Sequence, residues 1–162
     1  MSYPDPRYLG EGGETTVRVR PAATAPDLSA SNGNRTHYLA TGASTDGRFG
    51  LYRLDMSRAV SGPGPHFHRT ISESFFVLAG TVRLFDGRAW LDGQPGDFLY
   101  VPEGGIHGFR NESGAPASML LLFAPGAPRE AYFETTARLA AGLEMTDEER
   151  RAFYLAHDNH WV

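Results

Sequence analysis

The feature that most constrains the fold is a series of short strand-like segments with no helical segment between them. Each segment is rich in apolar or β-branched residues and is bounded by Gly, Pro, Asp or Asn, which favour turns. Asp86-Gly87 is a strong signal for a two-residue hairpin loop. Closely spaced short strands predict an all-β sandwich or barrel instead of a parallel sheet. The segments are residues 36–40, 49–55, 74–78, 81–86, 88–91, 98–101, 107–111 and 117–124.

The chain before these segments has a different character. Residues 1–35 are rich in Pro, Gly, Ala and Asn and contain one strand-like run at 15–20. We therefore expect an N-terminal arm with a short strand, partly ordered by packing on another surface. Residues 36–126 are expected to form the β barrel.

Residues 127–162 are predicted to form a C-terminal helical segment. Pro128 suits a first helical position, and Tyr132, Leu139 and Leu143 can share one side of a helix that ends near residue 144. Thr146 followed by Glu149 has the spacing of a capping box, which predicts a second helix to about residue 157. The prediction is thus an all-β body with two C-terminal α-helices.

Length and composition exclude several functional classes. The 162 residues suit one domain, and a net charge of −4 offers no basic face for nucleic acid. No apolar run approaches the length of a membrane span, and the first residues lack the pattern of a signal peptide, so a cytoplasmic protein is expected. The absence of cysteine excludes disulfides, thiol catalysis and thiolate metal ligands.

Three histidines and a glutamate suggest a metal site. His66 and His68 are two residues apart in an extended segment and therefore point to the same face. Glu73 follows a short bend, and His107 lies on a later strand, so the four side chains can close around one metal ion. A single histidine among strands is more often a hydrogen-bonded polar residue, but this combination favours a metal. Imidazole and carboxylate ligands suit Fe, Mn, Ni, Co or Zn as one divalent ion per subunit.

Two segments match a family pattern. Residues 62–80 (GPGPHFHRTISESFFVLAG) resemble the first cupin motif, G-x5-H-x-H-x3,4-E-x6-G, except that Val60 stands where the leading glycine would fall. Residues 96–111 (GDFLYVPEGGIHGFRN) resemble the second motif, G-x5-P-x-G-x2-H-x3-N, at every fixed position. The chain is thus similar to the cupin superfamily, and most similar to small, single-domain quercetin 2,3-dioxygenase-like cupins.

The resemblance implies a fold, an assembly and a set of site residues. It implies a double-stranded β-helix, or jelly-roll barrel, in a homodimer, with His66, His68, Glu73 and His107 as metal ligands. In dioxygenases of this type the glutamate also accepts a proton from the substrate hydroxyl, so Glu73 is the candidate catalytic base. The implied partners are a small-molecule enol or phenol and O₂, with no nucleic acid or membrane.

An apolar pocket is expected beside the metal. Strand alternation from Glu73 and His107 places further side chains on the same inward faces, while the parity of other aromatic and apolar positions stays open. Each of these residues can equally be barrel core, but together they favour a planar, flavonol-like substrate. The candidates are Phe75, Val77, Phe109, Phe49, Leu51, Tyr100 and Phe123.

Two other functions remain open from the sequence. A redox-inert metal acting as a Lewis acid would give a cupin cyclase, isomerase or lyase of secondary metabolism. A ligand-binding cupin without turnover is the third reading, although it has no need to keep all four ligands.

Overall fold

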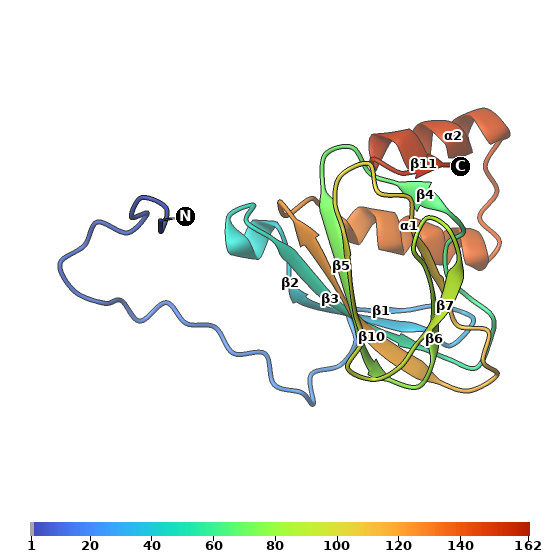
Figure 1. Cartoon of the computed structure of the whole chain (residues 1–162), viewed down its shortest axis with the longest axis horizontal. Helices are drawn as coiled ribbons and strands as arrows, with labels where there is room; N and C mark the ends of the chain where they lie inside the picture. The colour runs from blue at the N-terminus through green and yellow to red at the C-terminus, as the bar shows by residue number, and fades with distance from the viewer. Residues whose placement is uncertain (1) are drawn as a thin grey trace.

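The computed structural model describes residues 2–162, whose strands pair into three antiparallel sheets (Figure 1). Two of these sheets form a jelly-roll sandwich, as predicted, and the third is a short two-stranded pair. The larger sheet of the sandwich has the order β1-β2-β3-β10-β5-β8, and its smaller sheet has the order β7-β6-β9. The strands are β1 (Leu28–Ser29), β2 (Arg35–Ala40), β3 (Gly50–Met56), β4 (His66–Phe67), β5 (Ser72–Ala79), β6 (Val82–Phe85), β7 (Trp90–Gly93), β8 (Phe98–Val101), β9 (Gly108–Arg110), β10 (Ala117–Ala124) and β11 (His160–Trp161), with a 3₁₀ turn η1 (Ala43–Thr45).

The core lies between the two sheets and follows from strand alternation. Along β10 the residues alternate strictly between buried and half-buried, so that every second side chain faces the core. Tyr52 is completely buried and meets the ring of Phe123 edge-on at 5.9 Å between centroids. The other large core residues are Met56, Ile71, Phe75, Val77, Val82, Leu84, Val101, Phe109, Met119 and Leu121.

The hairpin at Asp86-Gly87 forms, but its loop is longer than predicted. Phe85 pairs with Trp90, so the loop comprises four residues, 86–89, and not two. The Asp86 carboxylate accepts hydrogen bonds from the backbone N–H groups of Arg88 and Ala89, both at 2.8 Å. These side-chain contacts stabilise the wider turn, which the dipeptide signal alone does not reveal.

The strand predicted at residues 15–20 is wrong. This run is extended and largely exposed, and in the part of the chain that the structure describes no strand pairs with it. A strand is stable only when its backbone groups find a neighbouring strand. The short strand of this region is instead β1, which pairs with β2.

Two helices follow the sheets. The first, α1 (Glu130–Ala140), ends four residues before the predicted point because Gly142 adopts φ +102°. Around it the Leu143 N–H bonds to the Arg138 carbonyl at 2.9 Å and the Gly142 N–H to the Leu139 carbonyl at 3.1 Å, the pattern of a Schellman motif. The second helix, α2 (Asp147–Ala156), begins with the predicted capping box of Thr146 and Glu149.

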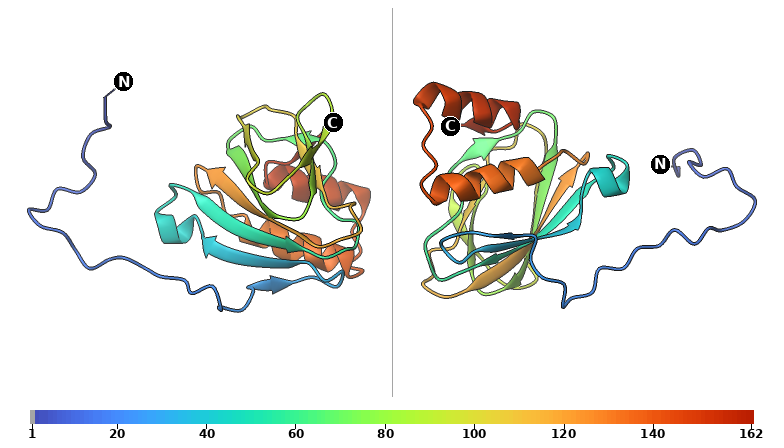
Figure 2. Two further views of the ribbon diagram at one scale, coloured as in Figure 1. Left: turned by 60° about the horizontal axis from the view of Figure 1, so that its bottom comes forward. Right: turned by 180° about the vertical axis from the view of Figure 1, so that it is seen from behind.

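The helices lie together on one side of the sandwich (Figure 2). Phe133 of α1 packs edge-on against Tyr52 at 5.1 Å, and Phe153 of α2 stacks on Tyr132 at 5.6 Å. After α2 the chain returns as β11, which pairs with β4. The C-terminus is thereby brought to the strand that carries His66. Neither helix, nor any other among the described residues, has the length and hydropathy needed to cross a membrane.

Candidate metal centre and its cavity

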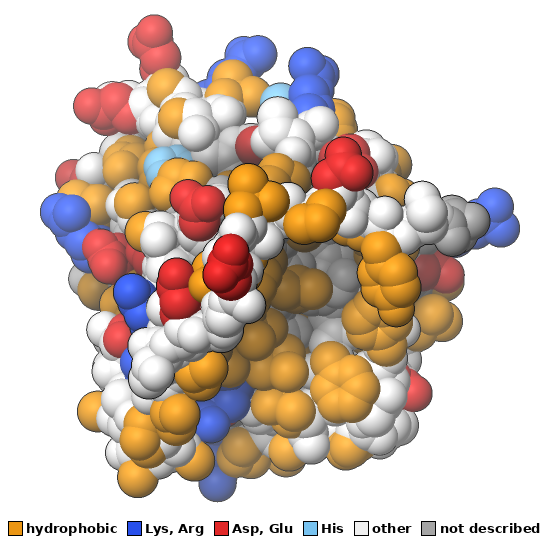
Figure 3. Space-filling view, turned by 90° about the vertical axis from the view of Figure 1, so that its left-hand side faces the viewer, with side chains coloured by type: hydrophobic (Ala, Val, Ile, Leu, Met, Phe, Trp, Pro, Cys, Tyr) orange, Lys and Arg blue, Asp and Glu red, His pale blue; other side chains and the backbone are white. Residues whose placement is uncertain are grey.

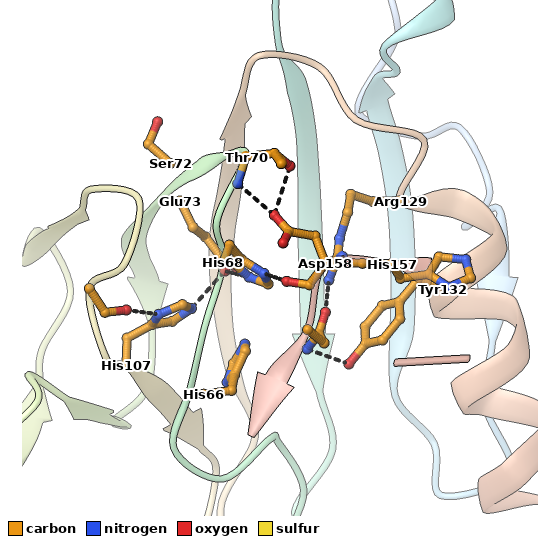
Figure 4. Close-up of polar contacts among 12 residues, drawn as sticks. His66, His68, Thr70, Ser72, Glu73, His107, Arg129, Tyr132, His157 and Asp158 are labelled. Atoms are coloured by element: carbon orange, nitrogen blue, oxygen red, sulfur yellow. Dashed lines mark hydrogen bonds and ion pairs between the residues drawn. The ribbon is translucent and has the colours of Figure 1, made fainter. Parts of the chain in front are cut away.

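The four predicted ligands meet in one buried group. His66 is on β4, Glu73 is on β5, and His107 directly precedes β9. The backbones of His66 and His107 exchange two hydrogen bonds, of 2.9 and 2.8 Å, which set these residues side by side. One potential ligand atom from each of His66, His68, Glu73 and His107 lies within 4.8 Å of the others, so that the group can hold a metal ion (Figure 4).

The backbone fixes the protonation of all three imidazoles. Each Nδ1 lies beside a carbonyl oxygen, which only accepts hydrogen bonds, so Nδ1 carries the proton. In the neutral ring the lone pair is then on Nε2, the atom available to a metal. The contacts are His66 Nδ1 to Gly64 O at 2.9 Å, His68 Nδ1 to Asp158 O at 2.6 Å and His107 Nδ1 to Gly105 O at 3.0 Å.

The distances around Glu73 fit a metal ion. Its Oε2 lies 3.1 Å from His68 Nε2 and 2.9 Å from His107 Nε2. With the neutral tautomers, these contacts set lone pairs against each other unless a cation or a second ring proton lies between them. Adjacent ligands about 2.1 Å from a six-coordinate metal are about 3.0 Å apart, close to the observed spacing. The donor set therefore fits a divalent transition metal.

Electrostatics keep the carboxylate ionised. Burial alone would raise the pKa of Glu73, but hydrogen bonds from His107 and His68, which these rings donate when they carry a second ring proton, outweigh it and hold the pKa well below its usual range. Burial, followed by repulsion from His107, lowers the pKa of His66 to about 4. Burial would also lower the pKa of His107, but its contact with Glu73 outweighs this and raises it. At a pH below this raised pKa, a metal that binds at His107 would displace a proton.

A cavity of about 420 Å³ extends from the ligand group toward the helices. His66 and Glu73 form part of its wall, and Thr36, Leu54 and Met56 contribute from the larger sheet. Its aromatic lining comes from both the sandwich and the C-terminal segment. These aromatic residues are Phe109, Phe123, Tyr132, Phe133, Tyr154 and Trp161.

Only some of the predicted pocket residues line this cavity. Phe109 and Phe123 do, whereas Phe75 and Val77 share the inward side of Glu73 but are completely buried in the core. The Phe75 ring packs 5.8 Å from that of His107.

Three further pocket candidates, whose strand parity the sequence left open, do not line this cavity. On β3 the inward residue is Tyr52, so Leu51 faces outward. Tyr100 alternates with the buried Val101 and is 58% exposed. Phe49 precedes β3 and is 37% exposed. A shift of one residue moves a side chain to the other face of a sheet, which the sequence pattern did not resolve here.

The C-terminal segment contributes contacts that sequence reasoning missed. Asp158 has φ +56°, and its carbonyl accepts the His68 Nδ1 hydrogen bond. Its carboxylate accepts bonds from the Arg69 and Thr70 N–H groups at 2.8 to 3.0 Å and from the Thr70 hydroxyl at 2.7 Å (Figure 4). The Trp161 ring lies 5.3 Å from that of His66. The polar and aromatic run at residues 157–161 was the only local signal.

We expect Asp158→Ala to weaken metal binding about 10-fold, because Asp158 orients His68 and the loop that follows it. The measurement is the zinc affinity of the metal-free protein, titrated against a competing chelator. Asp158→Asn, which tolerates positive φ, should lose less. Asp92→Ala, on the distant β7, should keep the wild-type affinity. Wild-type affinity in Asp158→Ala would show that the C-terminal segment does not support the metal centre.

The remaining histidines lie outside the ligand group. His37 is buried on the outer side of the larger sheet, where its Nε2 lies 3.1 Å from Asp55 and 2.8 Å from Arg53. His160 contacts the Asp158 carboxylate at 3.1 Å, and His157 contacts the Phe153 carbonyl at 2.9 Å.

Two other residues of the motif segments lie outside the ligand group. Asn111 serves the fold, because its amide donates to the Ser57 and Ala115 carbonyls at 2.7 and 2.8 Å. Arg69, beside the ligands, is exposed at the surface.

The jelly-roll sandwich and the buried group of three histidines and one glutamate place this chain among β-barrel proteins with a candidate metal centre. The family model described as "Cupin domain" matches residues 56–123, which include all four members of the group. Residues 56–123 of this chain are therefore a cupin domain.

Individual relatives are more distant. The quercetin 2,3-dioxygenase of Bacillus subtilis (strain 168) is 32% identical over 116 residues, which cover 64% of this chain and 30% of that protein. The chain thus matches less than a third of that relative's length.

Solved structures show the same fold at low identity. A predicted oxalate decarboxylase from Thermotoga maritima superposes with a TM-score of 0.58 at 17% identity, over 67% of this chain and 99% of that one. An RmlC-like cupin from Shewanella frigidimarina NCIMB 400 gives a TM-score of 0.54 at 17% identity, over 66% and 88%.

Proposed function

We propose that this protein is a metal-dependent dioxygenase that acts on a planar enol or phenol of the flavonol kind. The main support is that one aromatic cavity of about 420 Å³ reaches both His66 and Glu73 of the ligand group. A cavity of this volume suits a small organic molecule. The identity to a quercetin 2,3-dioxygenase supports the reaction class by analogy.

In this proposal the residues of the site have different roles. His66, His68, His107 and Glu73 would hold one divalent ion (Fe, Mn, Ni, Co or Zn), which supplies Lewis acidity and, if redox-capable, the electron transfer that dioxygenation needs. Both imidazole contacts of Glu73 use Oε2, which leaves Oε1 for the cavity. In this proposal Glu73 takes the proton of the substrate hydroxyl, and the aromatic walls orient the ring and exclude water.

Oxygen consumption tests the proposal. Protein reconstituted separately with Fe(II), Mn(II), Ni(II), Co(II) and Zn(II) would be supplied with quercetin and a panel of phenols. We expect oxygen uptake with at least one redox-capable metal and none with zinc, and no uptake by His107→Ala protein treated in the same way.

Absence of uptake from every metal-loaded form, although phenols bind, would contradict the dioxygenase. Conversion of a phenol or enol without oxygen would favour a redox-neutral cyclase, isomerase or lyase. Binding without conversion would favour a ligand-binding cupin.

We further propose a cytoplasmic homodimer, built from an arm of residues 1–35, a barrel of residues 36–126 and a helical segment of residues 127–162. Hydrophobic side chains gather around a hollow on the side of the molecule that lies to the left in Figure 1 (Figure 3). On β5 and β8, exposed side chains that a partner subunit would cover are Phe76, Leu78, Phe98 and Tyr100.

A further inference from the structure

Arg129 places a buried positive charge in the wall of the cavity. It directly precedes α1 and lines the same cavity as His66 and Glu73, yet it is only 4% exposed. Its guanidinium carbon lies 4.1 Å from the centre of the Tyr132 ring and 4.9 Å from that of Phe123. The aromatic wall therefore contains a fixed cation.

The hydrogen bonds of Arg129 do not neutralise this charge. Nη1 donates to the His157 carbonyl at 2.7 Å and Nη2 donates to the Asn159 side-chain oxygen at 3.1 Å (Figure 4), and both acceptors are neutral. Nε is buried without a hydrogen-bond partner. Among residues 2–162 no carboxylate lies within ion-pair distance of this guanidinium.

Two other arginines of the molecule differ from Arg129 because each has a carboxylate partner. Arg53 and Arg83 also have a buried Nε without a hydrogen-bond partner, but their guanidinium groups pair with Asp55 and Asp92 at 3.2 and 3.1 Å. A buried charge is costly unless an opposite charge accompanies it. The cavity is the space beside Arg129 that can hold such a charge.

We propose that the cavity binds a planar organic acid whose carboxylate pairs with Arg129. The carboxylate would accept from the guanidinium, while the ring lies among the aromatic walls. This deepens the function proposed above and rests on it for the other end of the ligand, an enol or phenol oxygen near Glu73. The substrate class is thus a hydroxylated aromatic or enolic carboxylic acid.

A purely structural role for Arg129 makes a different prediction. If Arg129 served only to anchor His157 and Asn159, the cavity would have no preference for an anion. Arg69, the cation nearest the ligands in sequence, is exposed and is not part of the cavity wall. It therefore provides a matched control.

The test compares 6-hydroxy-2-naphthoate with its neutral amide, 6-hydroxy-2-naphthamide, by isothermal titration calorimetry. The two probes have the same ring and hydroxyl group and differ in the charge at the far end. We expect wild-type protein to bind the carboxylate at least about 10-fold more tightly, in both the zinc-loaded and the metal-free forms. Equal affinities in wild type would overturn the proposal, as would a preference that disappears when zinc is removed.

Variants assign the preference to one residue. Arg129→Met should bring the two affinities close together, whereas Arg129→Lys should keep part of the preference and Arg69→Gln all of it. Thermal unfolding shows whether each variant is folded, and the wild-type comparison stands without them. An unchanged preference in folded Arg129→Met would also overturn the proposal.

The oxygen measurement separates this inference from the proposed function. Carboxylate preference without oxygen uptake on any phenol or enol would refute the dioxygenase but support the anion site. Uptake with equal affinity for the acid and the amide would support the dioxygenase and refute the anion site.

Discussion

Replacing His107 by alanine should remove most of the bound metal. His107 offers Nε2 to the ligand group and lies beside His66 through two backbone hydrogen bonds. Loss of an outer-shell partner of a ligand already weakens metal binding 10- to 100-fold, so we expect loss of a ligand itself to cost about 10-fold or more. His66→Ala should have a similar effect. Metal content after equilibrium dialysis against a defined zinc concentration measures both.

His37→Ala is the matched control for these variants. His37 is as well buried as the ligands, but it contacts Asp55 and Arg53 on the outer side of the larger sheet. Its removal should leave the metal content unchanged. Full metal content in folded His107→Ala or His66→Ala protein would show that the ligand set is wrong.

Glu73→Gln should separate metal binding from turnover. Three imidazoles and an amide oxygen remain, so we expect the variant to keep much of its metal. The amide cannot accept the substrate proton, and loss of a general base costs about 100-fold or more in rate. The measurement is oxygen uptake per bound metal, on the phenol and with the metal that serve the wild type.

Glu103→Gln controls for the change from carboxylate to amide. Glu103 lies in the exposed turn before His107 and outside the cavity wall, so its rate should equal that of the wild type. If Glu73→Gln turned over at the wild-type rate, Glu73 would not be the base. If it lost its metal, the carboxylate would be required for binding.

Much of the fold could be predicted because its signals are local. Residues 98–101 and 117–124 were predicted as strands with the boundaries that β8 and β10 have. The capping box at Thr146 and Glu149 also forms as predicted, since its hydrogen bonds join residues three apart. The predictions failed where a strand needs a pairing partner or where one glycine ends a helix. Residues 15–20 pair with no strand in the described part of the chain, and Gly142 ends α1 early.

The ligand group was predictable for a related reason. His66, His68 and Glu73 lie within eight residues, and His107 belongs to a second motif complete at every fixed position. Turn geometry and strand alternation then limit where these side chains can point.

The sequence by itself determined the antiparallel strands, the two helices and the ligand group, because each depends on neighbours close along the chain or on a spaced motif. Only the tertiary structure decided what surrounds that group. Residues far apart in sequence, such as His68 and Asp158, meet there through packing of the C-terminal segment. The buried charge of Arg129 became visible in the same way, since whether a charge has a partner depends on every element packed around it.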